Sequence, residues 1–309
     1  MITSFFRKST PLNYSVVILG LLFFFFYYQL KHVTGDNSLF NLVSTCIFLG
    51  VLFVSMFITN FIVKKNGLSK DSAYTVLVFF LFLLFFPGIL NNASLLYSNF
   101  FILLATRRII SLHSLKASKE KIFDASIWVF IATLFHFWSI LFIVLIFIAI
   151  LFHVARDYRN WFLPIIAFFS IAILFVGSAL YLKTEWIHRL IEQSIIDFRL
   201  DYFTNKNQNL AFSIYVTIGL FFVVLLLLSL ANRPLILHPT YKKVLSAIVI
   251  GMAVFAISPH KSNELLVFTF APLAMIATSH IETAQAYWKK EVVLWILLVV
   301  SFIAFFAQV

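Results

Sequence analysis

The stretch that decides the fold is Phe123–Val154, FDASIWVFIATLFHFWSILFIVLIFIAILFHV. An α-helix rises about 1.5 Å per residue, so one continuous helix of this length would extend well beyond a hydrocarbon core of about 30 Å. The segment His136-Phe137-Trp138-Ser139 interrupts the run with a titratable ring, an indole that favours membrane interfaces and a hydroxyl. We therefore predict two short helices joined at the membrane surface, a choice that sets the side of every later loop.

The composition is that of a membrane protein. Hydrophobic residues make up 62% of the chain and charged residues 11%, whereas soluble domains carry roughly 25% charged residues. The net charge of +11 is spread over short clusters between apolar segments, which indicates orientation in a bilayer rather than nucleic-acid binding. Cys46 is the only cysteine, which excludes an intrachain disulfide or a thiolate metal cluster.

The hydropathy pattern predicts an all-α fold: a polytopic transmembrane helix bundle of about 11 spans in a single integral membrane domain, residues 1–309. The basic N-terminus resembles a signal peptide, but its apolar stretch is long enough to span, so we expect it to be retained. The expected spans are Leu12–Leu30, Phe40–Val63, Tyr74–Leu90, Asn92–Ile110, Phe123–Phe137, Ser139–Val154, Phe162–Leu182, Ala211–Ala231, Val244–Ser258, Glu264–Thr283 and Val292–Val309.

The distribution of Lys and Arg predicts the orientation, because cytoplasmic loops of membrane proteins are rich in these residues. With the N-terminus cytoplasmic and Phe123–Val154 folded as a hairpin, 17 Lys and Arg residues lie inside and 6 outside. A single crossing by that stretch would give 15 and 8 instead. The hairpin is therefore favoured.

The longest loop, residues 183–210, is expected on the outer face. Apolar residues recur in it at helical spacing while charged residues take the other side, which predicts an amphipathic surface helix lying on the bilayer. The apolar set is Ile187, Leu190, Ile191, Ile195, Phe198 and Tyr202.

Three polar groups are expected on the outer face. In the first outer loop, Asp36 is a candidate catalytic base, or the Gly35–Ser38 turn simply caps the next helix. In the loop from Ser258 to Glu264, His260 and Lys261 are suited to holding a lipid phosphate, with Glu264 capping the next helix or orienting His260. A solvated turn with a snorkelling lysine is the simpler alternative.

The third group is the hairpin tip that contains Asn92, together with His136. These side chains could line a sugar pocket, or they could cap helix ends. We find no His pair at metal-ligand spacing and no phosphate-binding glycine loop, so neither a metal nor a cofactor is expected.

The run Ser258–Glu282, SPHKSNELLVFTFAPLAMIATSHIE, resembles the late outer loop and helix of polytopic glycosyltransferases that use a polyprenyl-phosphate sugar. In that family a His-Lys pair precedes an aromatic residue and then a Pro-Leu helix, and Asp36 occupies a place similar to the family's first-loop acidic residue. The matching positions here are His260, Lys261, Phe268, Pro272 and Leu273.

Over most of its length the chain resembles an uncharacterised polytopic inner-membrane family of Bacteroidota. This likeness rests on Ser4-Phe5-Phe6, Arg107-Arg108, Phe123-Asp124-Ala125 and the SPHKSNELL stretch, and it implies a bacterial inner membrane location.

Three functions stay open. The first is a glycosyltransferase-like enzyme that takes a polyprenyl-phosphate-linked sugar at the outer face, with Asp36 as base. The second is a non-enzymatic structural subunit of a cell-envelope complex, which packs against other membrane proteins and lipids. The third is a lipid or solute transporter. It ranks last because the sequence shows neither an inverted repeat nor a buried charge, the features that would indicate one.

Overall fold

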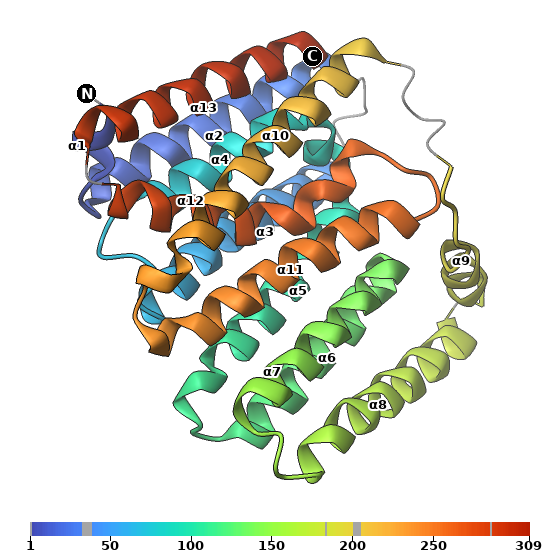
Figure 1. Cartoon of the computed structure of the whole chain (residues 1–309). Helices are drawn as coiled ribbons and strands as arrows, with labels where there is room; N and C mark the ends of the chain where they lie inside the picture. Colours follow the sequence, from blue (N-terminus) through green and yellow to red (C-terminus); the bar gives the residue numbers. More distant parts are fainter. Residues whose placement is uncertain (1, 33–38, 183, 200–204, 285) are drawn as a thin grey trace. The chain divides into compact units, whose positions relative to one another are not determined.

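A computed structural model describes residues 2–32, 39–182, 184–199, 205–284 and 286–309 (Figure 1). The described residues form thirteen α-helices and several short 3-10 turns, with no strand among them, which confirms the all-α prediction. Eight helices are long and apolar enough to cross a membrane. The chain is therefore a multi-pass membrane protein, and each of the eleven segments predicted to span coincides with a helix.

The chain divides into two compact units. Unit 1 contains residues 1–96, 203–237 and 270–309, and unit 2 contains residues 97–202 and 238–269. Unit 1 holds α1 (Ile2–Phe6), α2 (Pro11–His32), α3 (Leu39–Lys65), α4 (Tyr74–Phe85), η1 (Pro87–Asn91), α10 (Lys206–Ser229), η4 (Leu230–Asn232), η5 (Leu235–Leu237) and α13 (Tyr287–Gln308). Unit 2 holds η2 (Ser111–Ser114), α6 (Ser118–Phe135), η3 (Phe137–Phe142), α7 (Ile143–His153), α8 (Arg159–Leu182), α9 (Glu185–Gln193), α11 (His238–Ile257) and η6 (Asn263–Leu266). Both α5 (Ala93–Ile110) and α12 (Val267–Thr283) contribute residues to each unit.

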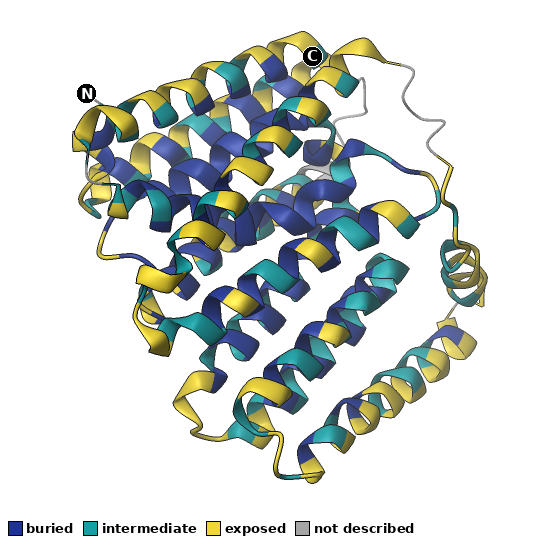
Figure 2. Ribbon diagram, viewed as in Figure 1, coloured by how far each residue is buried: buried dark blue, intermediate teal, exposed yellow. Residues whose placement is uncertain are grey.

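The core of unit 1 is built around α4. All twelve of its residues are buried, as expected for a helix that is apolar on every side. It packs against α2, α3, α10 and α13 (Figure 2). The helix stops before Pro87, because a residue that precedes proline is disfavoured in the helical conformation. Beyond this end, the ring of Phe86 stacks on that of Phe270 at 6.1 Å.

In unit 2 the predicted break at His136 is confirmed. His136 is extended (φ −144°, ψ 110°) and separates α6 from η3, while Ser139 Oγ donates to the carbonyl of His136 at 2.8 Å. The two arms, α6 and α7, contact each other, and α8 packs mainly on α6. Close approach of α11 to the start of α12 requires Gly251, where a Cβ would lie 2.8 Å from Cγ2 of Thr269.

The amphipathic surface helix is present but shorter than predicted. Helix α9 ends at Gln193, and none of its residues is buried. Ile195 and Phe198 lie beyond it in a segment without regular structure, and Tyr202 lies outside the described residues. This segment is tied to unit 2 instead, because the amide of Asp197 donates to the carbonyl of Ile257 at 3.1 Å.

Each unit carries its basic residues mainly at one end. In unit 1, hydrogen bonds join α1, the α3–α4 loop and the α12–α13 turn at one end, while Gln308 reaches the carbonyl of Phe85 at the other. Eight Lys and Arg residues belong to the first end and two to the second. The eight are Arg7, Lys8, Lys64, Lys65, Lys70, Arg233, Lys289 and Lys290.

In unit 2, nine Lys and Arg residues lie at the end where α5, α7 and the start of α11 meet. Three of the described ones lie at the His136 end. In both units the richer ends are those predicted to face the cytoplasm.

Candidate functional site

The residues predicted on the outer face are only partly brought together. Asp36 lies outside the described residues. His260 is exposed, with φ of 50° in the left-handed region, whereas Lys261 is buried and donates its ammonium to the carbonyl of Asp197. The two neighbours therefore lie in different environments. Glu264 is half-buried in the first turn of η6.

His136 lies in a buried polar contact of unit 2. Its Nε2 is 3.0 Å from Oγ of Ser258, which in turn donates to the carbonyl of Val254 at 2.6 Å. Ser258 is completely buried, and the ring of Phe268 lies 5.8 Å from the imidazole. This pair links the α6–η3 corner to the end of α11.

Asn92 belongs to unit 1, where its Oδ1 accepts a hydrogen bond from the amide of Leu95 at 3.2 Å. This geometry matches the helix-capping alternative, because it satisfies a free amide in the first turn of α5.

A larger polar site lies at the basic end of unit 1. A cavity of about 620 Å³, here named the basic cavity, lies between α1, the α3–α4 loop and the α12–α13 turn. Ligand pockets commonly measure about 300–1,000 Å³. It is lined by Arg7, Lys8, Ser9, Thr10, Lys70, Asp71, Ser72, Tyr74, Glu282 and Lys290.

The position of one wall of the basic cavity depends on α1, which hydrogen bonds hold in place. The carboxylate of Glu291 on α13 accepts hydrogen bonds from the amides of Ile2 (2.8 Å) and Thr3 (3.1 Å) and from the hydroxyl of Thr3. It thereby satisfies free amides at the start of α1. The hydroxyl of Tyr74 donates to the carbonyl of Thr3 at 2.7 Å, so α1 is fixed at both its beginning and its side.

Both acids of the basic cavity already have protein partners. Glu282 accepts from Ser69 Oγ (2.5 Å) and from the amide of Lys70 (2.7 Å), and Asp71 pairs with Lys64 at 2.9 Å. Among the described residues, the side chains of Arg7, Lys8 and Lys70 make no ion pair or hydrogen bond. The uncompensated charge of the cavity is therefore positive.

The basic cavity also contains a buried hydroxyl without a partner. Ser72 is 2% exposed, and its Oγ forms no hydrogen bond among the described residues. Leaving a buried hydroxyl unsatisfied costs about 1–3 kcal/mol, so such groups usually bind water or a ligand.

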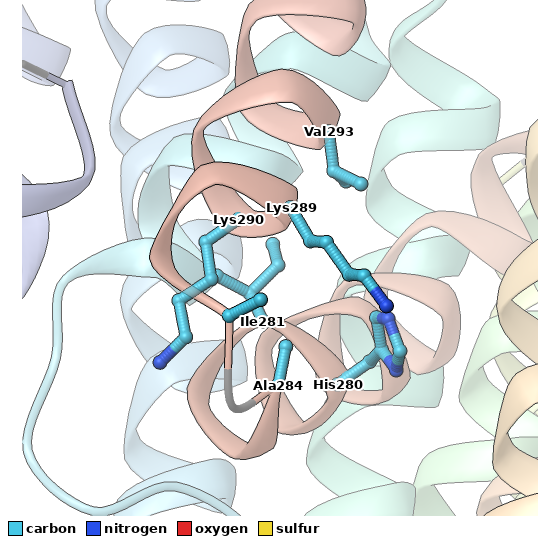
Figure 3. A pocket seen from close by; sticks show the side chains of 7 residues that line it. His280, Ile281, Ala284, Lys289, Lys290 and Val293 are labelled. Carbon is cyan, nitrogen blue, oxygen red and sulfur yellow. The ribbon is translucent and has the colours of Figure 1, made fainter.

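A second cavity, of about 330 Å³, lies between the end of α12 and the start of α13. Figure 3 shows Lys289 of α13 reaching toward the ring of His280, while Lys290 extends on the opposite side. We name it the turn cavity; it is lined by His280, Ile281, Ala284, Ala286, Lys289, Lys290 and Val293. Lys290 lines both cavities.

At the basic end of unit 2 the central lysine is fully engaged by the protein. Lys243 is 1% exposed, and its ammonium donates to the carbonyls of Ile109 (3.0 Å) and Ile110 (3.2 Å) and lies 3.1 Å from Nε2 of His153. The two carbonyls lie at the end of α5, and that of Ile110 also lies 3.1 Å from Nδ1 of His113. Lys243 therefore fastens three helix ends together.

Sequence reasoning missed both cavities and the role of Lys243. In the sequence the basic residues indicated only the membrane orientation. The segments that form the basic cavity are far apart in the chain, near residues 7, 70, 282 and 290. The available signal for Lys243 was its helical spacing from the apolar Ala247, which places it on the buried face of α11.

Comparison with known proteins gives a family but no activity. No curated protein of known function and no solved structure matches the chain. Residues 9–309 match DUF6427, which is described as a family of unknown function. Since this match covers nearly the whole sequence, the chain belongs to the DUF6427 family.

Proposed function

We propose that this multi-pass membrane protein binds the phosphate-bearing head group of an anionic lipid in the basic cavity of unit 1. The observation that carries the proposal is the set of cations without protein partners, Arg7, Lys8 and Lys70, which line one cavity together with Ser72. Guanidinium, ammonium and hydroxyl groups are donors, and a phosphodiester supplies the acceptors they lack.

The location of the basic cavity supports a lipid rather than a soluble ligand. The cavity lies where several apolar helices of unit 1 begin or end, and in this proposal that end of unit 1 lies at the level of lipid head groups. Tyr287 and Trp288 follow directly on the α12–α13 turn and are 40% and 65% exposed. Aromatic side chains of this kind gather at the membrane interface. Basic pockets between membrane helices are a common form of lipid recognition.

The charge asymmetry supports a cytoplasmic position for this site. The end of unit 1 that holds the basic cavity has eight Lys and Arg residues and the other end has two. In this proposal the richer end, and with it the N-terminus, faces the cytoplasm, as the positive-inside rule predicts. In a bacterium the membrane with this asymmetry is the inner membrane.

The test measures lipid binding by the purified full-length chain in mild detergent, using native mass spectrometry. The probes are phosphatidylglycerol, which is anionic, and phosphatidylcholine, which is not. We expect preferential retention of phosphatidylglycerol and a loss of about thirtyfold in the double variant Arg7→Gln/Lys70→Gln, since each surface cation contributes about 1 kcal/mol.

Lys65→Gln is the matched control. Lys65 is exposed at the same end of unit 1 but does not line either cavity. Equal losses in the control and the double variant, or equal retention of the two lipids by the wild-type chain, would overturn the proposal. Glycerol phosphate serves as a soluble competitor, and its failure to displace the lipid is expected if the acyl chains contribute to binding.

A second candidate function is sugar transfer from a polyprenyl phosphate at the predicted outer face. The observation that favours it is that His136, Ser258 and Lys261 gather at one end of unit 2, away from that unit's basic end. In this proposal His260 and Lys261 hold the donor phosphate. The role of Asp36 as the base stays a prediction from the sequence. Retention of sugar transfer by purified Asp36→Asn and His260→Gln variants, beside a His188→Gln control in α9, would exclude this mechanism.

The third candidate function is that of a non-enzymatic envelope subunit, and the observation that favours it is the exposed surface of helix α8. Of its 24 residues only Asn160, Pro164, Ala167 and Ala179 are buried. In this proposal another membrane protein covers the apolar face of α8. Purification in mild detergent that yields only monomer without a partner would count against it.

A further inference from the structure

We propose that the turn cavity is a second phosphate subsite, so that the preferred ligand is a lipid whose head group carries two phosphodiesters, as in diphosphatidylglycerol. This inference rests on the proposed function of the basic cavity and extends it to a ligand class. The feature behind it is that two separate cavities share one cationic side chain, that of Lys290.

The turn cavity has the chemistry of an anion site. Three of its lining side chains, His280, Lys289 and Lys290, carry nitrogen atoms that can donate hydrogen bonds, and none of the seven lining residues is acidic. The other members are apolar, so they offer an anion no competing acceptor side chain. A phosphodiester oxygen is the acceptor that such a group of donors favours.

Lys289 and His280 face the turn cavity from two helices. Figure 3 shows the ammonium of Lys289 beside the ring of His280, with α13 supplying the first and α12 the second. Lys289 also lies 5.8 Å from the ring centroid of Trp288, which leaves its ammonium hydrogens available for an acceptor. The donors of this subsite therefore come from both sides of the α12–α13 turn.

Lys290 connects the two subsites. Among the described residues its Nζ makes one hydrogen bond, to the carbonyl of Glu282 at 3.3 Å. Glu282 itself lines the basic cavity, so this contact holds the ammonium at the boundary between the basic cavity and the turn cavity. An ammonium has three donors, so two remain for ligand oxygens.

The separation of the cavities points to two phosphates rather than one. Arg7, Lys70 and Lys290 line the basic cavity, whereas Lys289 and His280 line only the turn cavity, so a single phosphodiester in the basic cavity leaves these two donors unused. A head group with two phosphodiesters joined by a short linker can occupy both cavities and use Lys290 twice. Both volumes, about 620 Å³ and about 330 Å³, fall in the range of ligand pockets.

The test compares diphosphatidylglycerol with phosphatidylglycerol on the full-length chain in mild detergent, by competition in native mass spectrometry. We expect the wild-type chain to prefer the two-phosphate lipid by about tenfold or more. Lys289→Gln should remove most of this preference and leave phosphatidylglycerol binding unchanged, because Lys289 lines only the turn cavity. Lys290→Gln should weaken both lipids, and Lys65→Gln neither.

The outcomes separate this inference from the proposed function. If phosphatidylglycerol binds and is lost in Arg7→Gln/Lys70→Gln, but the wild-type chain shows no preference for two phosphates, the turn cavity is not a subsite. If neither anionic lipid binds better than phosphatidylcholine, the proposed function fails and this inference falls with it. Inorganic pyrophosphate is the soluble probe of the same chemistry, and its displacement of the lipid at micromolar concentration would identify a soluble ligand instead.

Discussion

The basic end of unit 1 and the basic end of unit 2 hold similar numbers of Lys and Arg residues, eight and nine, but use them differently. In unit 2, Lys243 fastens three helix ends, Lys121 donates to Ser111 and Ser114, and two further cations are in ion pairs. In unit 1, several cations line a cavity without protein partners among the described residues. A count of charges therefore predicts membrane orientation, whereas the bonds of each charge decide which cations are available to a ligand.

The largest effect is expected in unit 2, for the buried Lys243. Lys243→Met should lower the free energy of unfolding by about 2 kcal/mol, because the carbonyls of Ile109 and Ile110 and the ring of His153 lose a buried donor. Thermal unfolding in detergent measures it. Lys242→Met is the matched control, since Lys242 is adjacent but exposed. Equal shifts in the two variants would show that Lys243 does not hold unit 2 together.

A smaller effect is expected at the wall of the basic cavity. Glu291→Gln should lower the stability of α1 by about 1 kcal/mol, since a carboxylate accepts capping hydrogen bonds more strongly than an amide. Hydrogen exchange of residues 2–8 should rise several-fold, and phosphatidylglycerol binding should weaken because Arg7 and Lys8 follow α1. Glu185→Gln in the exposed α9 is the control. Unchanged hydrogen exchange of residues 2–8 would show that the carboxylate of Glu291 does not stabilise α1.

The smallest effect concerns an exposed ion pair of unit 2. The amide of Arg159 donates to Asp157 and lowers the pKa of that carboxyl, and Lys119 at 3.2 Å lowers it further. A lowered pKa stabilises the fold above the ordinary carboxyl pKa, and this stabilisation is lost as the pH falls through the lowered value. The melting temperature of wild type should therefore exceed that of Asp157→Asn slightly at pH 7, and the gap should close toward pH 3. A gap that widens on acidification would contradict this assignment.

The helices were predictable because their signal is local. Long apolar runs must form helices in a bilayer. The length of Phe123–Val154 indicated a break, and the residues from His136 to Ser139 located it. Helix α9 was predicted too long because the apolar spacing in the sequence continues through Phe198 to Tyr202. The chain at Asp197 is held instead by a backbone hydrogen bond to Ile257, which no periodicity reveals.

The candidate site was less predictable because it is assembled from distant segments. Asn92 shows the helix-capping contact that the sequence offered as one alternative. The basic cavity brings Arg7 beside Lys70 and Lys290, and nothing in the spacing of these residues indicates proximity. Lys242 and Lys243 look alike in the sequence, yet one is exposed and the other is enclosed by three acceptors.

The capping of α1 by Glu291 has a consequence for biosynthesis. The two partners are separated by 289 positions, so a ribosome delivers the amides of α1 long before the carboxylate that receives them. During translation α1 must wait uncapped at the membrane surface while the intervening helices insert. Insertion of the individual helices and closure of unit 1 are then distinct events, and the wall of the basic cavity forms only after α13 has entered the bilayer.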